Sequence, residues 1–120
     1  PSLYHAVALA TVSLAETVGA EVIVAFSTSG NTAVRIARER PRIPFLVLSP
    51  FVEVRRRLAI LWGTKTAGST ITEDFEAAIA EGVAEIGNRG IAAAGAHVVI
   101  VAGMPFGIAG TTNSIRVATI

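Results

Sequence analysis

The chain has 120 residues, enough for one domain with its own hydrophobic core. Hydrophobic residues make up 52% and charged residues 16%, a balance too apolar for a disordered segment. The formal net charge is +1, so no overall field draws the chain to nucleic acid or to an acidic membrane. There is no cysteine, which excludes disulfides, thiolate metal sites and cysteine nucleophiles and fits a cytoplasmic protein.

The ends of the chain carry little information about targeting. No apolar run reaches the length of a membrane span, and no basic-then-apolar leader opens the sequence. We therefore expect no membrane association. The first residue is Pro1 rather than Met, so we expect either a processed polypeptide or a fragment of a longer one.

Helical and extended patterns alternate from the beginning of the chain. Apolar residues near helical spacing predict a helix over residues 2–18. Residues 21–26 form a short, continuous, β-branched run, which is typical of a buried parallel strand. A polar turn follows, and a second helix is predicted over residues 32–40, where Pro41 ends it.

The alternation continues through the middle of the chain. Residues 45–48 predict the second strand. A third helix is expected from Ser49 and Pro50 to about Trp62, with Ser49 as its cap. Residues 64–66 suggest a brief third strand.

Three more elements complete the predicted order. A fourth helix is expected from Thr70 or Thr72 to Gly87 or Gly90. The fourth strand is predicted over residues 97–102, followed by a glycine-rich loop over 103–113 and a last strand over 114–120.

This order of elements predicts a single α/β domain. Strands that alternate with helices form βαβ units, which build a mostly parallel sheet. The last connection is too short for a crossover helix, so we expect the last strand to be antiparallel to its neighbour.

The first candidate site is the loop between the first strand and the second helix. In open α/β sheets, ligands bind beyond the carboxyl ends of the strands. This loop offers four hydroxyls, an amide, a flexible glycine and the backbone N–H groups of a helix N-terminus, which together favour a phosphate. It contains no Lys, Arg or carboxylate, so it can bind an anion but cannot perform acid–base catalysis. Its residues are Ser27, Thr28, Ser29, Gly30, Asn31 and Thr32.

Each candidate loop also has a purely structural interpretation. The hydroxyls of the first loop could simply cap the helix, although one would suffice. The second loop, over residues 103–113, contains three glycines and one proline and is longer than most connectors, which favours a function. It could equally be a plain connection to an edge strand.

Other chemistries are less consistent with the sequence. The string S-T-S-G-N-T is similar to a flavodoxin phosphate loop, but here a long helix precedes the strand, and Tyr4 and Trp62 do not lie in loops suited to a flavin. His5 and His97 have no partner at ligand spacing, so we expect no metal site. We also expect no catalytic residues. The run Arg55-Arg56-Arg57 is typical of a solvated helix surface, with subunit contact or anion binding as alternatives.

Four segments resemble, in order and spacing, the C-terminal domain of pyruvate kinases. The strongest match is similar to that family's ending G-x-P-x-G…G-T-T-N-x-x-x-V. The others begin with a strand and a Thr/Ser-Gly loop, continue with R-P-R-I-P and L-V-L-S-P, and include an R-x-L-x-L-x-x-G helix end. In this sequence they are Ala20 to Ala33, Arg40 to Pro50, Arg56 to Gly63, and Gly103 to Gly107 with Gly110 to Val117.

The resemblance implies a three-layer α/β/α domain with a five-stranded mixed sheet in the order 3-2-1-4-5, strand five being antiparallel. It also implies that residues 1–120 form one domain of a phosphotransferase that converts phosphoenolpyruvate and ADP to pyruvate and ATP. The catalytic barrel, which uses Mg and K ions, is not represented in these residues. The implied partners are that barrel domain and further copies in a homotetramer.

The resemblance further implies a phosphorylated small-molecule effector. Ser27, Thr28, Ser29, Gly30 and Thr32 would match the family's phosphate loop, and residues 107–111 its flexible effector loop. Members regulated by fructose 1,6-bisphosphate use a further Arg on the fourth helix, where this chain has Ala80. A monophosphate, a nucleotide monophosphate or no effector therefore all remain open. A free-standing phosphate- or nucleotide-binding module and a flavodoxin-like FMN protein are the alternative functions.

Overall fold

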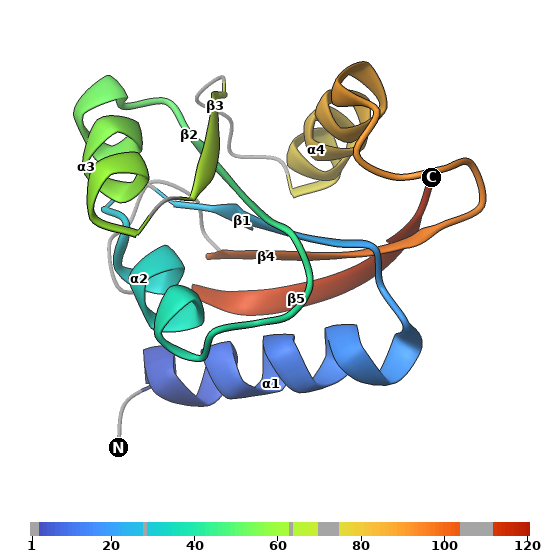
Figure 1. The fold of residues 1–120 in the computed structure, drawn as a ribbon, viewed down its shortest axis with the longest axis horizontal. Coiled ribbons are helices and arrows are strands. Elements are labelled where there is room, and N and C mark those ends of the chain that lie inside the picture. The colour runs from blue at the N-terminus through green and yellow to red at the C-terminus, as the bar shows by residue number, and fades with distance from the viewer. Residues whose placement is uncertain (1–2, 28, 63, 70–74, 104–111) are drawn as a thin grey trace.

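The structure is a computed structural model that describes residues 3–27, 29–62, 64–69, 75–103 and 112–120 (Figure 1). Four helices and five strands occupy these residues. In chain order they are α1 (Leu3–Val18), β1 (Val22–Phe26), α2 (Asn31–Arg38), β2 (Phe45–Ser49), α3 (Val52–Trp62), β3 (Lys65–Gly68), α4 (Phe75–Arg89), β4 (His97–Gly103) and β5 (Thr112–Thr119).

The five strands form one mixed sheet in the order β3-β2-β1-β4-β5. Strand β1 pairs in parallel with β2 on one side and with β4 on the other, and β2 pairs in parallel with β3. Only β5 is antiparallel, along β4. The predicted strand order and the antiparallel last strand are therefore confirmed.

Helices cover both faces of this sheet, so the chain forms three layers (Figure 1). On one face, Ala78, Ile79 and Ile86 of α4 pack against alternate residues of β1, β2 and β4. On the other face, α1 and α2 pack over β1 and β4, while Val54 and Leu58 of α3 pack with α2 and β2.

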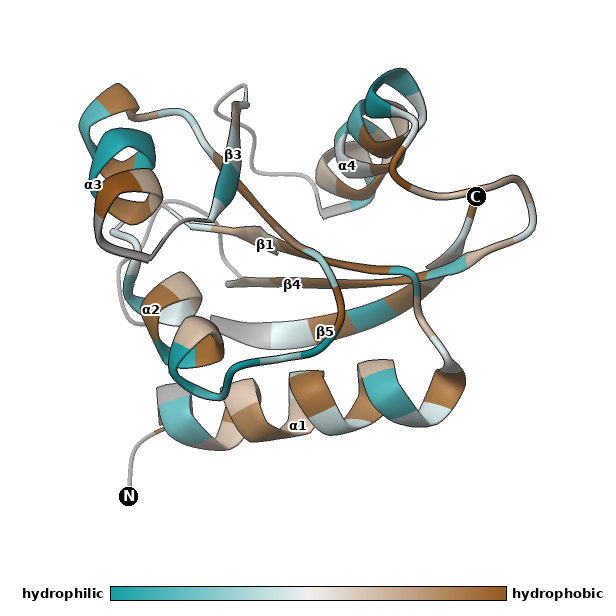
Figure 2. Cartoon of the chain, in the orientation of Figure 1, coloured by the Kyte–Doolittle hydropathy of each residue, from teal (hydrophilic) through white to brown (hydrophobic). Residues whose placement is uncertain are grey.

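The apolar strands at the centre of the sheet follow from this double coverage. All five residues of β1 are buried, as the unbroken apolar run predicted. Figure 2 shows that the central strands differ in hydropathy from the edge strand β5. Strands β1 and β4 are coloured mainly as hydrophobic, whereas hydrophobic and hydrophilic residues alternate along β5. None of the described helices is both long enough and apolar enough to cross a membrane.

Most predicted elements are present with small changes at their ends. Helix α2 begins at Asn31 rather than at residue 32 and ends at Arg38. Strand β3 covers Lys65–Gly68, one to two residues later than predicted. Strand β5 begins at Thr112, inside the predicted loop, because its ladder with β4 extends to Gly103. The predicted start of the fourth helix lies outside the described residues.

The prediction that Ser49 caps the third helix is wrong. Ser49 is the last residue of β2, and α3 begins only at Val52. Its hydroxyl accepts a hydrogen bond from the Phe51 N–H at 3.3 Å, so the side chain closes the turn before the helix. The parallel pairing of β2 with β3 extends to Ser49 and delays the helix start.

Gly82 faces the sheet from α4. A Cβ atom at this position would lie 3.5 Å from the Phe26 ring and 3.6 Å from Val24, which is ordinary contact. We expect Gly82→Ala to raise the free energy of unfolding by up to ~1 kcal/mol, because alanine is the better helix former. Gly82→Leu should lower it by about 1–3 kcal/mol through overpacking.

Chemical denaturation of these variants checks this prediction, with Gly87→Ala as the matched control. Gly87 lies on the same helix, and nothing approaches its Cβ position within 4 Å. The control therefore reports helix propensity alone. A loss of stability in Gly82→Ala, beside a gain in Gly87→Ala, would contradict the packing distances.

Candidate functional site

The candidate site lies at the carboxyl-terminal edge of the parallel strands, where the order of connections reverses between β1 and β4. Ala25 of β1 pairs with Val101 of β4, so the two strands end at the same level. Strands β1 and β4 therefore end side by side at this edge of the sheet. Gly107, Gly110 and Thr111 of the second predicted loop, and Thr28 of the first, lie outside the described residues.

Two of the predicted hydroxyls hold the loop after β1 in shape. The Ser27 hydroxyl accepts a hydrogen bond from the Gly30 N–H at 2.7 Å. The Ser29 hydroxyl accepts one from the Asn31 N–H at 3.3 Å. The Ser27 N–H donates to the Leu48 carbonyl at 3.0 Å, which fastens the loop to β2. Part of the hydroxyl content is thus structural, as the capping interpretation expects.

Gly30 is the N-cap residue of α2 and adopts a left-handed conformation, with φ at 88°. Its carbonyl accepts the Val34 N–H at 3.0 Å, which begins the helix. Because glycine has no side chain, the N-cap offers no side-chain acceptor to the first turn, unlike the usual Ser, Thr or Asp cap. Asn31 is exposed at the first helical position, and Thr32 is only 2% exposed.

A guanidinium group from α3 lies directly beside this loop. Arg57 Nη2 donates a hydrogen bond to the Ser29 carbonyl oxygen. The same nitrogen lies 2.7 Å from the position that a Cβ atom on Gly30 would occupy. Gly30 therefore serves two purposes: it accepts the left-handed backbone angle, and it leaves room for the Arg57 side chain.

The neighbouring arginines of α3 have different environments. Arg55 Nη1 donates to the Ser49 carbonyl at 2.7 Å, and its guanidinium packs against Gly68 at the end of β3. Arg56 is exposed. Two of the three arginines thus contact the backbone at the carboxyl-terminal edge of the sheet, rather than forming only a solvated surface.

The site combines positive charge with donors and lacks acidic groups at its helix. Helix α2, which the structure describes in full, has no acidic residue in its first turn, so its dipole and the Arg57 charge both favour an anion. The described part of the loop contains hydroxyls and amides only. Among the described residues, no cluster of three His, Asp or Glu could hold a metal ion. Residues 27 and 29–32, which are the described part of the loop, include no acidic or basic side chain.

Sequence reasoning singled out the loop, but it named Arg57 only as part of a basic run with anion binding as an alternative and did not place it beside the loop. The loop itself has no cation, and Arg57 lies 28 residues further along the chain. A signal was available: in a parallel sheet, the helix after the second strand begins at the same edge as the loop after the first. Basic residues in the first two turns of α3 are therefore placed near that loop.

Substitution of Gly30 tests the contact with Arg57. Gly30→Ala should lower the free energy of unfolding by about 1–2 kcal/mol for the left-handed backbone alone. The free energy of unfolding of this variant should fall by roughly 1 kcal/mol more, because the new methyl group displaces Arg57 from the Ser29 carbonyl. Chemical denaturation of the two single variants, Gly30→Ala and Arg57→Ala, and of the double variant measures both contributions.

Gly19→Ala is the matched control for this cycle. Gly19 has φ at 67°, but nothing lies within 4 Å of its Cβ position. It therefore reports backbone strain without a clash. In the Arg57→Ala background, the cost of Gly30→Ala should fall to that of Gly19→Ala. An unchanged cost would show that Arg57 does not occupy the space above Gly30.

A comparison with family models decides the identity of the fold. The model described as "Pyruvate kinase, alpha/beta domain" matches residues 5–118. The chain belongs to this family. The resemblance read from the sequence segments is thereby confirmed for nearly the whole length of this pyruvate kinase α/β domain.

Individual pyruvate kinases agree with this assignment. A pyruvate kinase of Agrobacterium vitis is 40% identical over 116 residues, which cover 97% of this chain and 24% of that protein. A pyruvate kinase of Methylorubrum extorquens is 39% identical and covers 98% of this chain and 25% of its own length.

A solved structure agrees as well. The structure "Cryptosporidium parvum pyruvate kinase in complex with ADP" superposes with a TM-score of 0.88 at 25% identity, over 99% of this chain and 24% of that one. This pyruvate kinase α/β domain thus spans about a quarter of the length of the relatives that it matches.

Proposed function

We propose that this chain is the effector-binding and subunit-contact domain of a pyruvate kinase polypeptide. The observation that carries the proposal is the match to the pyruvate kinase α/β domain over residues 5–118. The whole polypeptide would transfer a phosphoryl group from phosphoenolpyruvate to ADP in the cytoplasm. Its catalytic barrel, with Mg and K ions, would lie outside these 120 residues. This chain would bind neither ion and would supply no catalytic residue.

The effector would bind at the loop formed by residues 27–32. Three features of the described residues support this. The N-cap residue Gly30 has no side chain to occupy the site, the α2 dipole points its positive end at the loop, and the Arg57 guanidinium lies beside Gly30. Arg57 would exchange its bond with the Ser29 carbonyl for a charge-assisted bond to a phosphoryl oxygen. Gly107, Gly110 and Thr111 would complete the site from the segment after β4.

The same residues favour a ligand with one phosphoryl group. Helix α4 has Ala80 where bisphosphate-regulated family members carry an arginine, and Ala80 is exposed among Glu76, Glu81 and Glu85. Alanine at this position offers a second phosphoryl group neither charge nor a hydrogen-bond donor from its side chain. A sugar monophosphate or a nucleoside monophosphate is therefore the proposed class of effector.

Self-association is part of the proposal. Relatives of this chain are about four times longer, so the domain would lie beside a catalytic barrel of the same polypeptide. We expect copies of that polypeptide to form a homotetramer, with contacts near β5, which is an edge strand of the sheet. The family match makes a free-standing module or a flavodoxin-like FMN protein the weaker alternatives.

Calorimetric titration with glucose 6-phosphate and with AMP tests the effector site. Arg57→Ala should weaken binding of the preferred ligand about tenfold or more, because it removes one charge-assisted hydrogen bond. Ser29→Glu should abolish binding through charge repulsion, and it is better suited than a change at the buried Thr32.

Arg56→Ala is the matched control in these titrations. Arg56 neighbours Arg57 on the same helix and both are exposed, so the two variants lose the same charge from the same surface. Binding should be nearly unchanged in the control. Equal losses in both variants would indicate a general charge effect, and undiminished binding in Ser29→Glu would remove the site from this loop.

The catalytic part of the proposal has a separate test. The purified 120-residue chain should form no pyruvate from phosphoenolpyruvate and ADP in the presence of Mg and K ions. A polypeptide in which this chain follows a pyruvate kinase barrel should form it. Turnover by the 120-residue chain alone would contradict the assignment of catalysis to the barrel.

A further inference from the structure

The sheet has two edge strands, β3 and β5. The side chains that lie along the free edge of β3 set it apart from β5. Strand β3 has four residues and pairs only with β2. In a parallel ladder, alternate residues direct their N–H and C=O groups to the partner strand. The Ser69 N–H donates to the Ser49 carbonyl, which assigns the odd-numbered residues to the β2 side. The backbone groups of Thr66 and Gly68 therefore point to the free edge.

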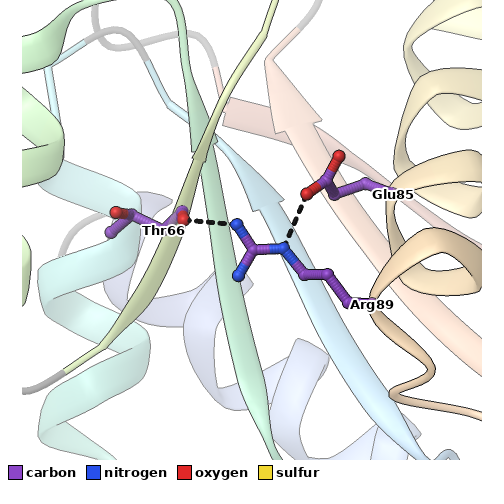
Figure 3. A network of polar contacts seen from close by, with 3 residues as sticks. All are labelled: Thr66, Glu85 and Arg89. Atoms are coloured by element: carbon purple, nitrogen blue, oxygen red, sulfur yellow. Dashed lines mark hydrogen bonds and ion pairs between the residues drawn. The ribbon is translucent and has the colours of Figure 1, made fainter.

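Arg89, the last residue of α4, covers the first of these outward carbonyls (Figure 3). Its Nη2 donates to the Thr66 carbonyl oxygen at 2.8 Å. Its Nε donates to Glu85 Oε1 at 2.6 Å, one helical turn earlier. The two side chains are 35% and 30% exposed, so the pair is held against the protein rather than extended into solvent.

The rest of the β3 edge is also unsuited to pairing. Lys65 places an exposed charge at its start. At its end, the Arg55 guanidinium lies 3.5 Å from the Cβ position of Gly68. Charged side chains and covered carbonyls are the means by which proteins prevent edge strands from pairing with another chain.

We propose that Arg89, oriented by Glu85, guards the β3 edge against pairing with a second copy of the chain. The consequence concerns the form of assembly. If β3 of one copy could pair with β5 of the next, the contact would be head-to-tail and would grow without closing. When pairing at β3 is blocked, β5 is the edge that remains for contacts between sheets. Two β5 strands related by a two-fold axis form a closed dimer rather than a growing chain.

Size-exclusion chromatography with light scattering, run on the 120-residue chain over a range of concentrations, tests whether Arg89 prevents pairing at the β3 edge. Arg89→Ala should give species at least twice the mass of the unaltered chain, increasing with concentration. Arg38→Ala is the matched control, because it also removes an exposed arginine that ends a helix, but on α2 rather than on or beside an edge strand. The control should keep the mass of the unaltered chain.

A second substitution separates edge pairing from general destabilisation. The Thr66 N–H points away from β2, so Thr66→Pro removes no bond of the ladder but blocks pairing at the free edge. The double variant Arg89→Ala/Thr66→Pro should return to the mass of the unaltered chain. If Arg89→Ala does not fold by circular dichroism, Arg89→Met, which keeps the apolar stem without the donors, replaces it.

Three outcomes would overturn the proposal. The first is an unchanged mass in the folded Arg89 variant across all concentrations. The second is a raised mass that Thr66→Pro does not restore, which would mean that association does not run through β3. The third is an equal rise in Arg38→Ala, which would reflect the loss of any exposed arginine at a helix end.

Discussion

Strand β1 is the element on which the rest of the domain depends. It is buried along its whole length, and it pairs with β2 on one side and with β4 on the other. A strand in this position must lack polar side chains on both faces, and helices must cover both faces to keep it dry. The three-layer arrangement follows from this requirement.

The same constraint sets the location of the candidate site. Parallel strands carry all their carboxyl ends to one edge, so the loop after β1, the start of α3 and the end of β4 meet there. The left-handed Gly30 lets α2 begin without a capping side chain and lets Arg57 approach the backbone. The proposed anion site needs no lysine within its own loop, because a helix on the next crossover supplies the charge.

Arginine is used repeatedly to bind backbone carbonyls in this domain. Of the ten basic residues, only Lys65 is not arginine. Arg55 binds the Ser49 carbonyl, Arg57 that of Ser29, and Arg89 that of Thr66. A planar guanidinium with several fixed donors can hold a carbonyl and a second group together, which a lysine ammonium does less well. The Ser29 carbonyl lies in the loop after β1 and the Thr66 carbonyl at the free edge of β3, whereas the Ser49 carbonyl also accepts the Ser69 N–H.

The sequence by itself determined the sheet and its helices, since unbroken apolar runs such as Val22–Phe26 and helical spacing are local properties. It also located the loop of Ser27 to Thr32, because small polar residues between a strand and a helix are a local signal. Only the tertiary structure decided the role of Arg57 and Arg89. Their partners lie 28 and 23 residues away in the chain, and the partners are carbonyl groups, which every residue has. A sequence shows which side chains are present, but only the crossover geometry determines which carbonyl each one reaches.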